Sequence, residues 1–296
     1  MLLTDFKYLI IVLVEWIFFS CHAHPCKDKT STTAYEYRLT DGEISVATGE
    51  FTTAAEIALQ NGSLDGWDGS SPNAATDSKF WDTSNEGAKM GGLTPTQAVT
   101  DFVHTQGGKA AKLESGKVDL MGGIFAAASL YTGSFGSTNI WTQTATVNFG
   151  QSFTARPIAL KGFYKYTPNV INLVKNVPAG VTIVKDQTLD QCAIYIALAK
   201  KTYTIDNGNQ STFIDFKNDE NIIAYGELPS GAATEGDGYV EFNIPLKYKN
   251  LTDQPTHIIV VCSSSKYGDY MTGGAGSTLY VDDLSLIYDG TPTIWE

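Results

Sequence analysis

The sequence has little positive charge, and its arginines are especially few. Only Arg38 and Arg156 are arginines, against 18 lysines, and the formal net charge is −12. Nucleic acids and anionic lipid surfaces bind basic faces, so neither class of partner is expected. The balance instead suits neutral ligands such as sugars, and divalent cations.

Cysteine is also scarce. Cys21 and Cys26 lie near the N-terminus, and Cys192 and Cys262 lie within apolar segments. No CxxC pair is present, and no Cys/His grouping suggests a zinc or redox centre. A Cys192–Cys262 disulfide is possible, but bridge geometry is strict and the sequence does not imply one. Two buried free thiols are the alternative.

The chain has no apolar run long enough for a comfortable membrane span. The run from Tyr8 to Ser20 has signal-peptide length, which predicts a signal peptide or lipoprotein leader over residues 1–21. Phe19-Ser20-Cys21 loosely resembles a lipobox, so acylated Cys21 is a candidate lipid anchor and the only expected link to a membrane. The protein is thus expected to be exported, either as an outer-membrane or cell-surface lipoprotein or in periplasmic or secreted form. Residues 22–59 are polar and Thr-rich and are predicted to be a linker.

What the sequence does contain is a series of alternating apolar segments. Ile158 to Tyr166, Cys192 to Leu198 and Val240 to Leu246 each alternate with period two, and Gly-rich turns lie between such segments. This pattern is typical of strands with one buried face. Since no segment shows a long helical period, residues 60–290 are predicted to form one all-β sandwich or barrel.

Motifs in this region occur in an order that resembles a known family. Asn61-Gly62-Ser63-Leu64-Asp65-Gly66-Trp67 is similar to the Asn-Gly-x-Phe-Glu-x-Trp opening of galactose-binding-like jelly rolls, with Leu64 and Asp65 as departures. Together with later motifs it resembles the bacterial "putative carbohydrate metabolism domain" family. The resemblance implies an exported, often lipid-anchored jelly-roll β-sandwich, like a carbohydrate-binding module, associated with polysaccharide use. The later motifs are Phe80 to Asn85, Gly108 to Leu113, Phe153 to Pro157, Lys161 to Tyr166, Ser263 to Tyr270 and Ser277 to Asp283.

The closing segment carries a carboxylate where the alternation predicts core. Asp282 shares a face with Leu284, while Asp283 falls on the opposite face and is expected to be a bystander. A buried carboxylate needs a cation or several donors. One hypothesis is a structural Ca²⁺ held by Asp282, Asp65 and Asn61, because related jelly rolls share such an ion between their first and last strands. Pairing with Arg156 and a hydrated turn cap are the alternatives.

Sugar binding needs flat aromatic faces and polar groups at their rim. Trp81, in a polar segment beside Asp82, is the preferred stacking platform, and Trp141 is expected to be half-exposed. Arg156 could bind hydroxyls through its planar guanidinium, or form a structural ion pair. The predicted carbohydrate-binding residues are Trp81, Asp82, Trp141, Arg156, Tyr164 and Tyr166.

The preferred function is therefore a non-catalytic, carbohydrate-binding module with a polysaccharide or glycan ligand. A glycoside hydrolase is the first alternative, but it needs two carboxylates about 5–10 Å apart, and no spacing singles out a pair. The sequence also has no G-x-S-x-G elbow for an esterase-type nucleophile. A structural or adhesive cell-surface module is the second alternative.

Overall fold

The computed structural model describes residues 34–41, 44–52, 56–119 and 123–295, in two compact units, Met1–Ile57 and Ala58–Glu296. In the first unit, β1 (Ala34–Asp41) and β2 (Ile44–Thr52) pair as an antiparallel hairpin, within the segment predicted to be a linker. The predicted leader and Cys21 lie outside the described residues. Within the described part of the chain, no helix has both the length and the apolar character that a membrane span requires.

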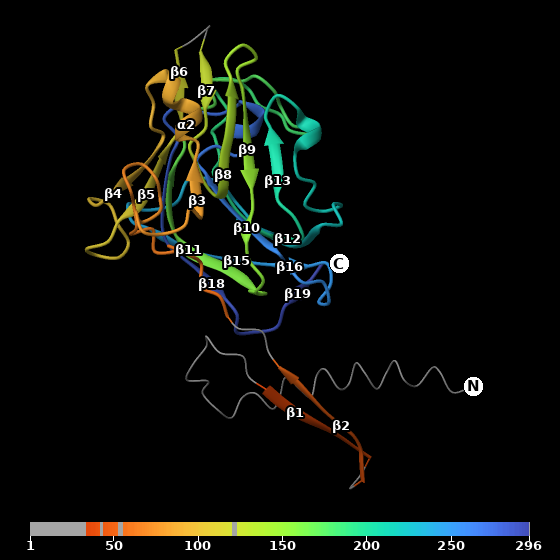
Figure 1. Cartoon of the computed structure of the whole chain (residues 1–296). Coiled ribbons are helices and arrows are strands. Elements are labelled where there is room, and N and C mark those ends of the chain that lie inside the picture. The colour runs from red at the N-terminus through yellow and green to blue at the C-terminus, as the bar shows by residue number, and fades with distance from the viewer. Residues whose placement is uncertain (1–33, 42–43, 53–55, 120–122, 296) are drawn as a thin grey trace. The chain divides into compact units, whose positions relative to one another are not determined.

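The second unit contains two large, mainly antiparallel β-sheets and almost no helix (Figure 1). The larger sheet follows the order β13-β9-β8-β17-β12-β14-β16-β19, with β3 also paired to β8 and β10 to β17. Its strands are β3 (Trp81–Thr83), β8 (Ser129–Asn139), β9 (Thr144–Phe149), β10 (Gln151–Ser152), β12 (Ala193–Ala199), β13 (Tyr203–Asp206), β14 (Ile222–Glu227), β16 (Lys247–Tyr248), β17 (His257–Ser263) and β19 (Thr293–Ile294).

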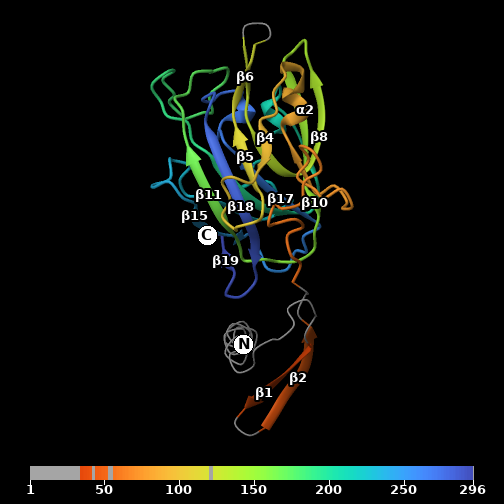
Figure 2. The same cartoon turned by 90° about the vertical axis from the view of Figure 1, so that its left-hand side faces the viewer.

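The smaller sheet, seen in front in Figure 2, has the order β15-β11-β18-β5-β4. Its strands are β4 (Thr96–Val99), β5 (Ala110–Glu114), β11 (Ala159–Thr167), β15 (Val240–Pro245) and β18 (Thr278–Ile287). A separate hairpin joins β6 (Gly116–Val118) to β7 (Ile124–Ala126). The predicted all-β jelly-roll sandwich is thus confirmed.

The core lies between the two sheets, and the predicted alternation explains which residues enter it. Leu160 and Tyr166 of β11, Ile196 of β12 and Ile244 of β15 all belong to one buried apolar cluster. The residues of β12 that alternate with Ile196, such as Ala197, belong to a second apolar cluster on the other face of the larger sheet. Because neighbours along a strand point to opposite faces, one apolar strand serves both clusters.

The closing strand breaks its alternation at a β-bulge, which corrects the prediction for Asp282. Phe163 of β11 pairs with Asp282 but Lys161 pairs with Ser285, so Asp283 and Leu284 together oppose Gly162. Asp283 takes φ 49°, as a bulged residue does. Val281 and Leu284 therefore both face the core, and Asp282 faces away from it.

The loop at residues 100–109 buries Asp282 on that outer side of the smaller sheet. The backbone N–H of His104 donates to Oδ2 of Asp282 at 2.7 Å. Asp283, expected to be a bystander, accepts hydrogen bonds at Oδ2 from Thr105 at 2.6 Å and contacts Nδ1 of His104 at 2.7 Å. Both carboxylates thus hold this loop on the sheet.

Candidate functional site

An apolar cavity of about 210 Å³ opens at one end of the sandwich. Its walls come from the short helices α2 (Asn85–Ala88) and η2 (Lys89–Gly91), the β6–β7 and β8–β9 hairpins, and η4 (Gly268–Tyr270). Figure 1 shows α2 and the β6–β7 and β8–β9 hairpins gathered at the end of the unit opposite the C-terminus. The volume lies below the range of about 300–1,000 Å³ for drug-sized ligands, so it suits one ring of a larger molecule.

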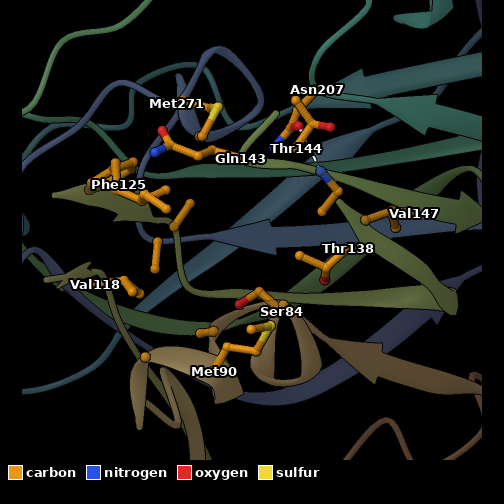
Figure 3. A pocket seen from close by; sticks show the side chains of 18 of the residues that line it. Ser84, Met90, Val118, Phe125, Thr138, Gln143, Thr144, Val147, Asn207 and Met271 are labelled. Carbon is orange, nitrogen blue, oxygen red and sulfur yellow. Dashed lines mark hydrogen bonds between the residues drawn. The ribbon is translucent and has the colours of Figure 1, made fainter. Parts of the chain in front are cut away.

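The walls of the cavity are set by close packing and by buried side-chain amides. A Cβ on Gly91 would lie 2.4 Å from Cγ1 of Val118, so glycine lets η2 lie against β6. Asn85 exchanges hydrogen bonds of 2.8 Å with the backbone of Thr96, which fixes α2 on β4. In Figure 3, Ser84 and Met90 lie at one end of the cavity, and Gln143 and Met271 at the other.

The β8–β9 hairpin brings an exposed tryptophan to this end of the sandwich. Trp141 is 86% exposed in the turn between the two strands, while Ile140 and Gln143 of the same turn line the cavity. Asn139 shapes the turn, because its Oδ1 accepts hydrogen bonds from the backbone N–H groups of Trp141 and Thr142. An indole of this exposure presents a flat apolar face to solvent, on a turn whose other residues line the cavity.

Polar groups without protein partners line the otherwise apolar cavity. The side chains of Thr138, Gln143 and Asp269 form no hydrogen bond or ion pair with any other residue that the structure describes. Asn207 accepts from the backbone N–H of Ala145 at 2.9 Å through Oδ1, which leaves its Nδ2 available. Apolar walls with a few convergent polar groups are typical of small-molecule sites.

Asp269 contributes the one charged side chain of the lining. Its side chain reaches solvent within the hollow, although protein surrounds it on most sides, and this loss of hydration raises its pKa to about 6. The negative charge of Asp269 also contributes to the raised pKa of Tyr195 on β12, after burial of that ring. Carboxyls with such perturbed pKa values cluster at functional sites.

Backbone strain marks the same cavity. Gln143 and Met271, both in its lining, adopt left-handed conformations with φ 57° and 55°. Non-glycine residues in this region cost of order 1–3 kcal/mol, and such residues cluster at functional sites. Gln143 is the last residue of the β8–β9 turn, and Met271 directly follows η4.

Of the predicted sugar-binding residues, Trp81 and Asp82 are structural in this fold. Trp81 has 0% exposure and donates from Nε1 to the carbonyl of Gln60 at 2.7 Å. It lies in the inter-sheet core and therefore cannot stack on a sugar, contrary to the sequence hypothesis. Asp82 is also buried, and its Oδ2 accepts from the backbone N–H of Phe135 and pairs with Lys79, both at 2.7 Å.

Tyr164 and Tyr166 belong to the core side of β11. Tyr166 has 0% exposure, and its hydroxyl donates to the carbonyl of Ser264 at 2.9 Å. Tyr164 is half-buried and packs edge-on against Phe242 with ring centroids 5.8 Å apart. None of the predicted set lines the cavity, but Trp141 lies in the turn whose residues Ile140 and Gln143 do.

Arg156 binds backbone carbonyls. Its guanidinium donates to the carbonyls of Asp253 and Asn250 and lies 4.7 Å from the ring centroid of Tyr248. Its donors are thus directed at the loop after β16, and Arg156 does not line the cavity. Among the described residues, the predicted ion pair between Arg156 and Asp282 is not formed.

The predicted calcium ligands lie on neighbouring segments, but each of them is hydrogen-bonded to backbone groups of the protein. The opening and closing segments are neighbours, because the N–H of Leu284 donates to the carbonyl of Gly62 at 2.7 Å. Asp65 accepts from the backbone N–H of Lys109 at 2.7 Å, and Asn61 exchanges hydrogen bonds with the backbone of Gly66. Asp282 accepts from two N–H groups.

A calcium cage needs six to eight oxygens directed at one ion, and in this structure the three predicted ligands accept hydrogen bonds from backbone N–H groups. Within the described residues, no group of three or more His, Cys, Asp or Glu side chains is placed to hold a metal. Calcium at these residues stays a prediction. Cys192 and Cys262 are free and buried, which was the alternative to a disulfide.

On the outer face of the larger sheet, partly buried aromatic rings stack on one another. Residues 206–221 bring Phe216 onto Tyr225, with ring centroids 4.3 Å apart and planes 15° apart. Trp295 stacks near the same tyrosine at 6.2 Å. The rings of this face therefore pack mainly on one another, in the second apolar cluster.

No pattern in the sequence singles out Asp269, Gln143, Met271 or Asn207. Asp269 lies inside a motif that carried the family resemblance, Ser263 to Tyr270, but nothing there distinguishes it from other acidic residues. The left-handed conformation of Met271 and Gln143 has no sequence signal, since glycine and asparagine are the usual residues there. Only the fold brings these four together.

Comparisons with known proteins agree with this architecture. The family model described as "Putative carbohydrate metabolism domain" matches residues 56–287. A crystal structure of a "putative glycoside hydrolase" from Bacteroides thetaiotaomicron is similar with a TM-score of 0.59 and 22% identity, over 89% of this chain and 81% of that one. One from Bacteroides vulgatus, described in the same words, has a TM-score of 0.52 and 24% identity, over 72% and 88%. No curated protein matches the chain.

Proposed function

The chain belongs to the "Putative carbohydrate metabolism domain" family, and from this premise we propose that it binds a glycan, with one sugar ring in the cavity beside η4 and a neighbouring ring on Trp141. The observation that carries the proposal is the placement of Trp141. It is the most exposed large apolar side chain of the described residues, and it stands on the hairpin whose turn lines the cavity.

The chemistry of the cavity supports a sugar as the ligand. A pyranose has apolar C–H faces and a rim of hydroxyls, so it needs apolar walls and a few hydrogen-bonding groups. Phe125 and Val147 supply apolar surface, and Thr138, Gln143 and Asp269 supply free acceptors and donors. A small cavity with an exposed indole outside it suits a chain of sugars better than a single small metabolite.

Binding without hydrolysis is favoured by the number of carboxylates. A glycosidase of the common type uses two carboxyl groups that flank the scissile bond about 5–10 Å apart. The lining of the cavity contains one, Asp269. Hydrolysis remains the second candidate, because a carboxyl with a pKa of about 6 could act as a general acid and because the two structural relatives are described as putative glycoside hydrolases.

The test is a glycan array over plant, host and bacterial polysaccharides, followed by titration calorimetry on the hits. We expect Trp141→Ala to weaken binding about tenfold or more, since one stacked aromatic contact of 1–2 kcal/mol corresponds to that change. Trp295→Ala is the matched control, because that ring packs near Tyr225 in the second cluster. An array with no hits, or equal affinities for the Trp141 variant and the unchanged protein, would contradict the proposal.

The cellular setting is part of this proposal. Export through the leader at residues 1–21, with or without acylation of Cys21, would place the domain where polysaccharides occur. The test is the mass of the mature N-terminus in a native host: cleavage before Cys21 with added acyl chains supports the anchor, and an intact Met1 contradicts export by this route.

A further inference from the structure

Asp269 is an unpaired carboxylate in an apolar cavity, and this arrangement selects among sugars. Its side chain is open to solvent within the hollow, and no donor from the described residues reaches it. The protein thus leaves an acceptor for the ligand to satisfy. A sugar ring with two adjacent hydroxyls can donate to both oxygens of one carboxylate.

Three lysines lie on or beside the segments that form the cavity, and none of them reaches Asp269. Lys117 on β6 pairs with Asp119 at 2.8 Å, and Lys89 on η2 pairs with Glu86 at 3.4 Å. From the loop before β12, Lys175 directs Nζ at the sulfur of Met271, 3.2 Å away. No lysine or arginine is part of the lining itself.

The remaining titratable neighbours add negative charge or none. Tyr195 on β12 lies near enough for the charge of Asp269 to raise its pKa, so this phenol stays neutral. Glu227 of β14 pairs with Tyr195 in the sheet, and its negative charge also raises the pKa of Tyr195. Among the described residues that line the cavity, Asp269 is the only charged one, and its carboxylate repels an anionic group bound beside it.

From these observations we infer that the cavity accepts a neutral sugar residue whose adjacent hydroxyls donate to Asp269, and that it rejects uronic acids and sulfated sugars. This inference rests on the proposed glycan binding and names its ligand class. The carboxylate of Asp269 both repels anionic sugars and accepts the hydrogen bonds of neutral ones, so substitution of this one residue removes both effects. Hydrogen bonds to a charged acceptor are the stronger ones, which makes Asp269 a specificity-determining residue.

The ionisation of Asp269 gives the recognition a pH dependence. Burial raises its pKa to about 6, so the group is mostly ionised at pH 7.5 and mostly protonated at pH 5. The protonated carboxyl accepts more weakly and no longer repels a uronate. As the pH is lowered from 7.5 to 5, the affinity for a neutral sugar should therefore decrease, and so should the difference in affinity between a neutral sugar and a uronate.

The experiment uses the full chain and matched oligosaccharides that end in galactose or galacturonic acid, and in glucose or glucuronic acid, by titration calorimetry at pH 7.5 and pH 5. We expect the neutral member to bind at least about tenfold more tightly at pH 7.5. Asp269→Asn should weaken neutral binding about 10–100-fold, the range for hydrogen bonds to a charged group. The variant should also lose the pH dependence and the discrimination.

Asp237→Asn is the matched control, because it removes an exposed carboxylate that does not line the cavity. A thermal melt of each variant checks folding, and Asp269 has no partner among the described residues whose loss would unfold the chain. Tighter uronate binding at pH 7.5, or unchanged neutral binding by Asp269→Asn with Trp141 still required, overturns this inference and leaves glycan binding intact. No binding of any glycan by the unchanged protein overturns both.

Discussion

The backbone N–H of His104 donates to the carboxylate of Asp282 at 2.7 Å, across 178 positions of the sequence. The second oxygen of Asp282 accepts from the N–H of Asp283 at 2.9 Å. Asp283 in turn contacts the His104 ring, which stacks on Phe163 with centroids 3.5 Å apart. Two adjacent carboxylates at one β-bulge thus fasten a long loop to the smaller sheet.

Asp282→Ala should destabilise the fold by about 1–3 kcal/mol, because it removes the charged acceptor of two partly buried backbone N–H groups, those of His104 and Asp283. Denaturation in urea measures this as a lower midpoint with an unchanged slope. Asp237→Ala, an exposed carboxylate elsewhere, is the control and should change stability by less than about 0.5 kcal/mol. Equal effects of the two substitutions would show that the bond to His104 contributes nothing.

Removal of calcium with a chelator tests whether Asp282 is held by hydrogen bonds alone or by a bound calcium ion. A calcium ion bound only to the folded chain would stabilise it, by about 2.7 kcal/mol at a concentration 100 times its dissociation constant. Since N–H donors already satisfy Asp282, we expect the melting temperature to be the same in EDTA and in calcium. A melting temperature that falls in EDTA and recovers on addition of calcium would establish the ion and contradict our assignment.

Arg156→Lys should lower stability and leave glycan binding unchanged. The guanidinium reaches two carbonyls, of Asn250 and Asp253, while it covers the ring of Tyr248. A lysine cannot reproduce this planar arrangement, so we expect a loss of about 1–2 kcal/mol. Denaturation and the glycan titration are measured on the same sample. A weaker affinity without loss of stability would return Arg156 to the binding site.

Asp190 should make stability depend on pH. It is 1% exposed, and its Oδ2 accepts hydrogen bonds from Ser265, Gly274 and Ser277 at 2.6, 2.7 and 3.1 Å. Burial is the main cause of its raised pKa, so the folded chain holds the proton more tightly than the unfolded one. Its contribution to stability is therefore greatest below the unfolded pKa of about 3.9 and declines as pH rises through the folded pKa.

Asp190→Asn tests this, because asparagine does not titrate. We expect the variant to be less stable by about 1–3 kcal/mol near pH 7, since its amide cannot accept all of these donors. The difference in unfolding free energy from the unchanged protein should be larger at pH 4 than at pH 7. A difference that grows as pH rises would mean that the folded state lowers the pKa of Asp190.

The sequence by itself determined the sandwich, because strand alternation is local. The inward faces of β11, β12 and β15 follow from a period of two, and the order of short motifs indicated the family. The same rule failed at Asp282, since one bulged residue reverses every later side chain. Alternation also does not show whether an aromatic side chain is buried or exposed. The expectation that Trp81 stacks on a sugar is wrong for this reason.

The tertiary structure alone decided the cavity. Its lining joins segments from Ser84 to Met271, and no local pattern records which loops meet at one end of a sandwich. The pKa of Asp269 and the strain at Gln143 and Met271 arise from that meeting, because burial and backbone conformation depend on neighbours far along the chain. The sequence sets the local conformation of each strand, and long-range packing sets where a ligand can bind.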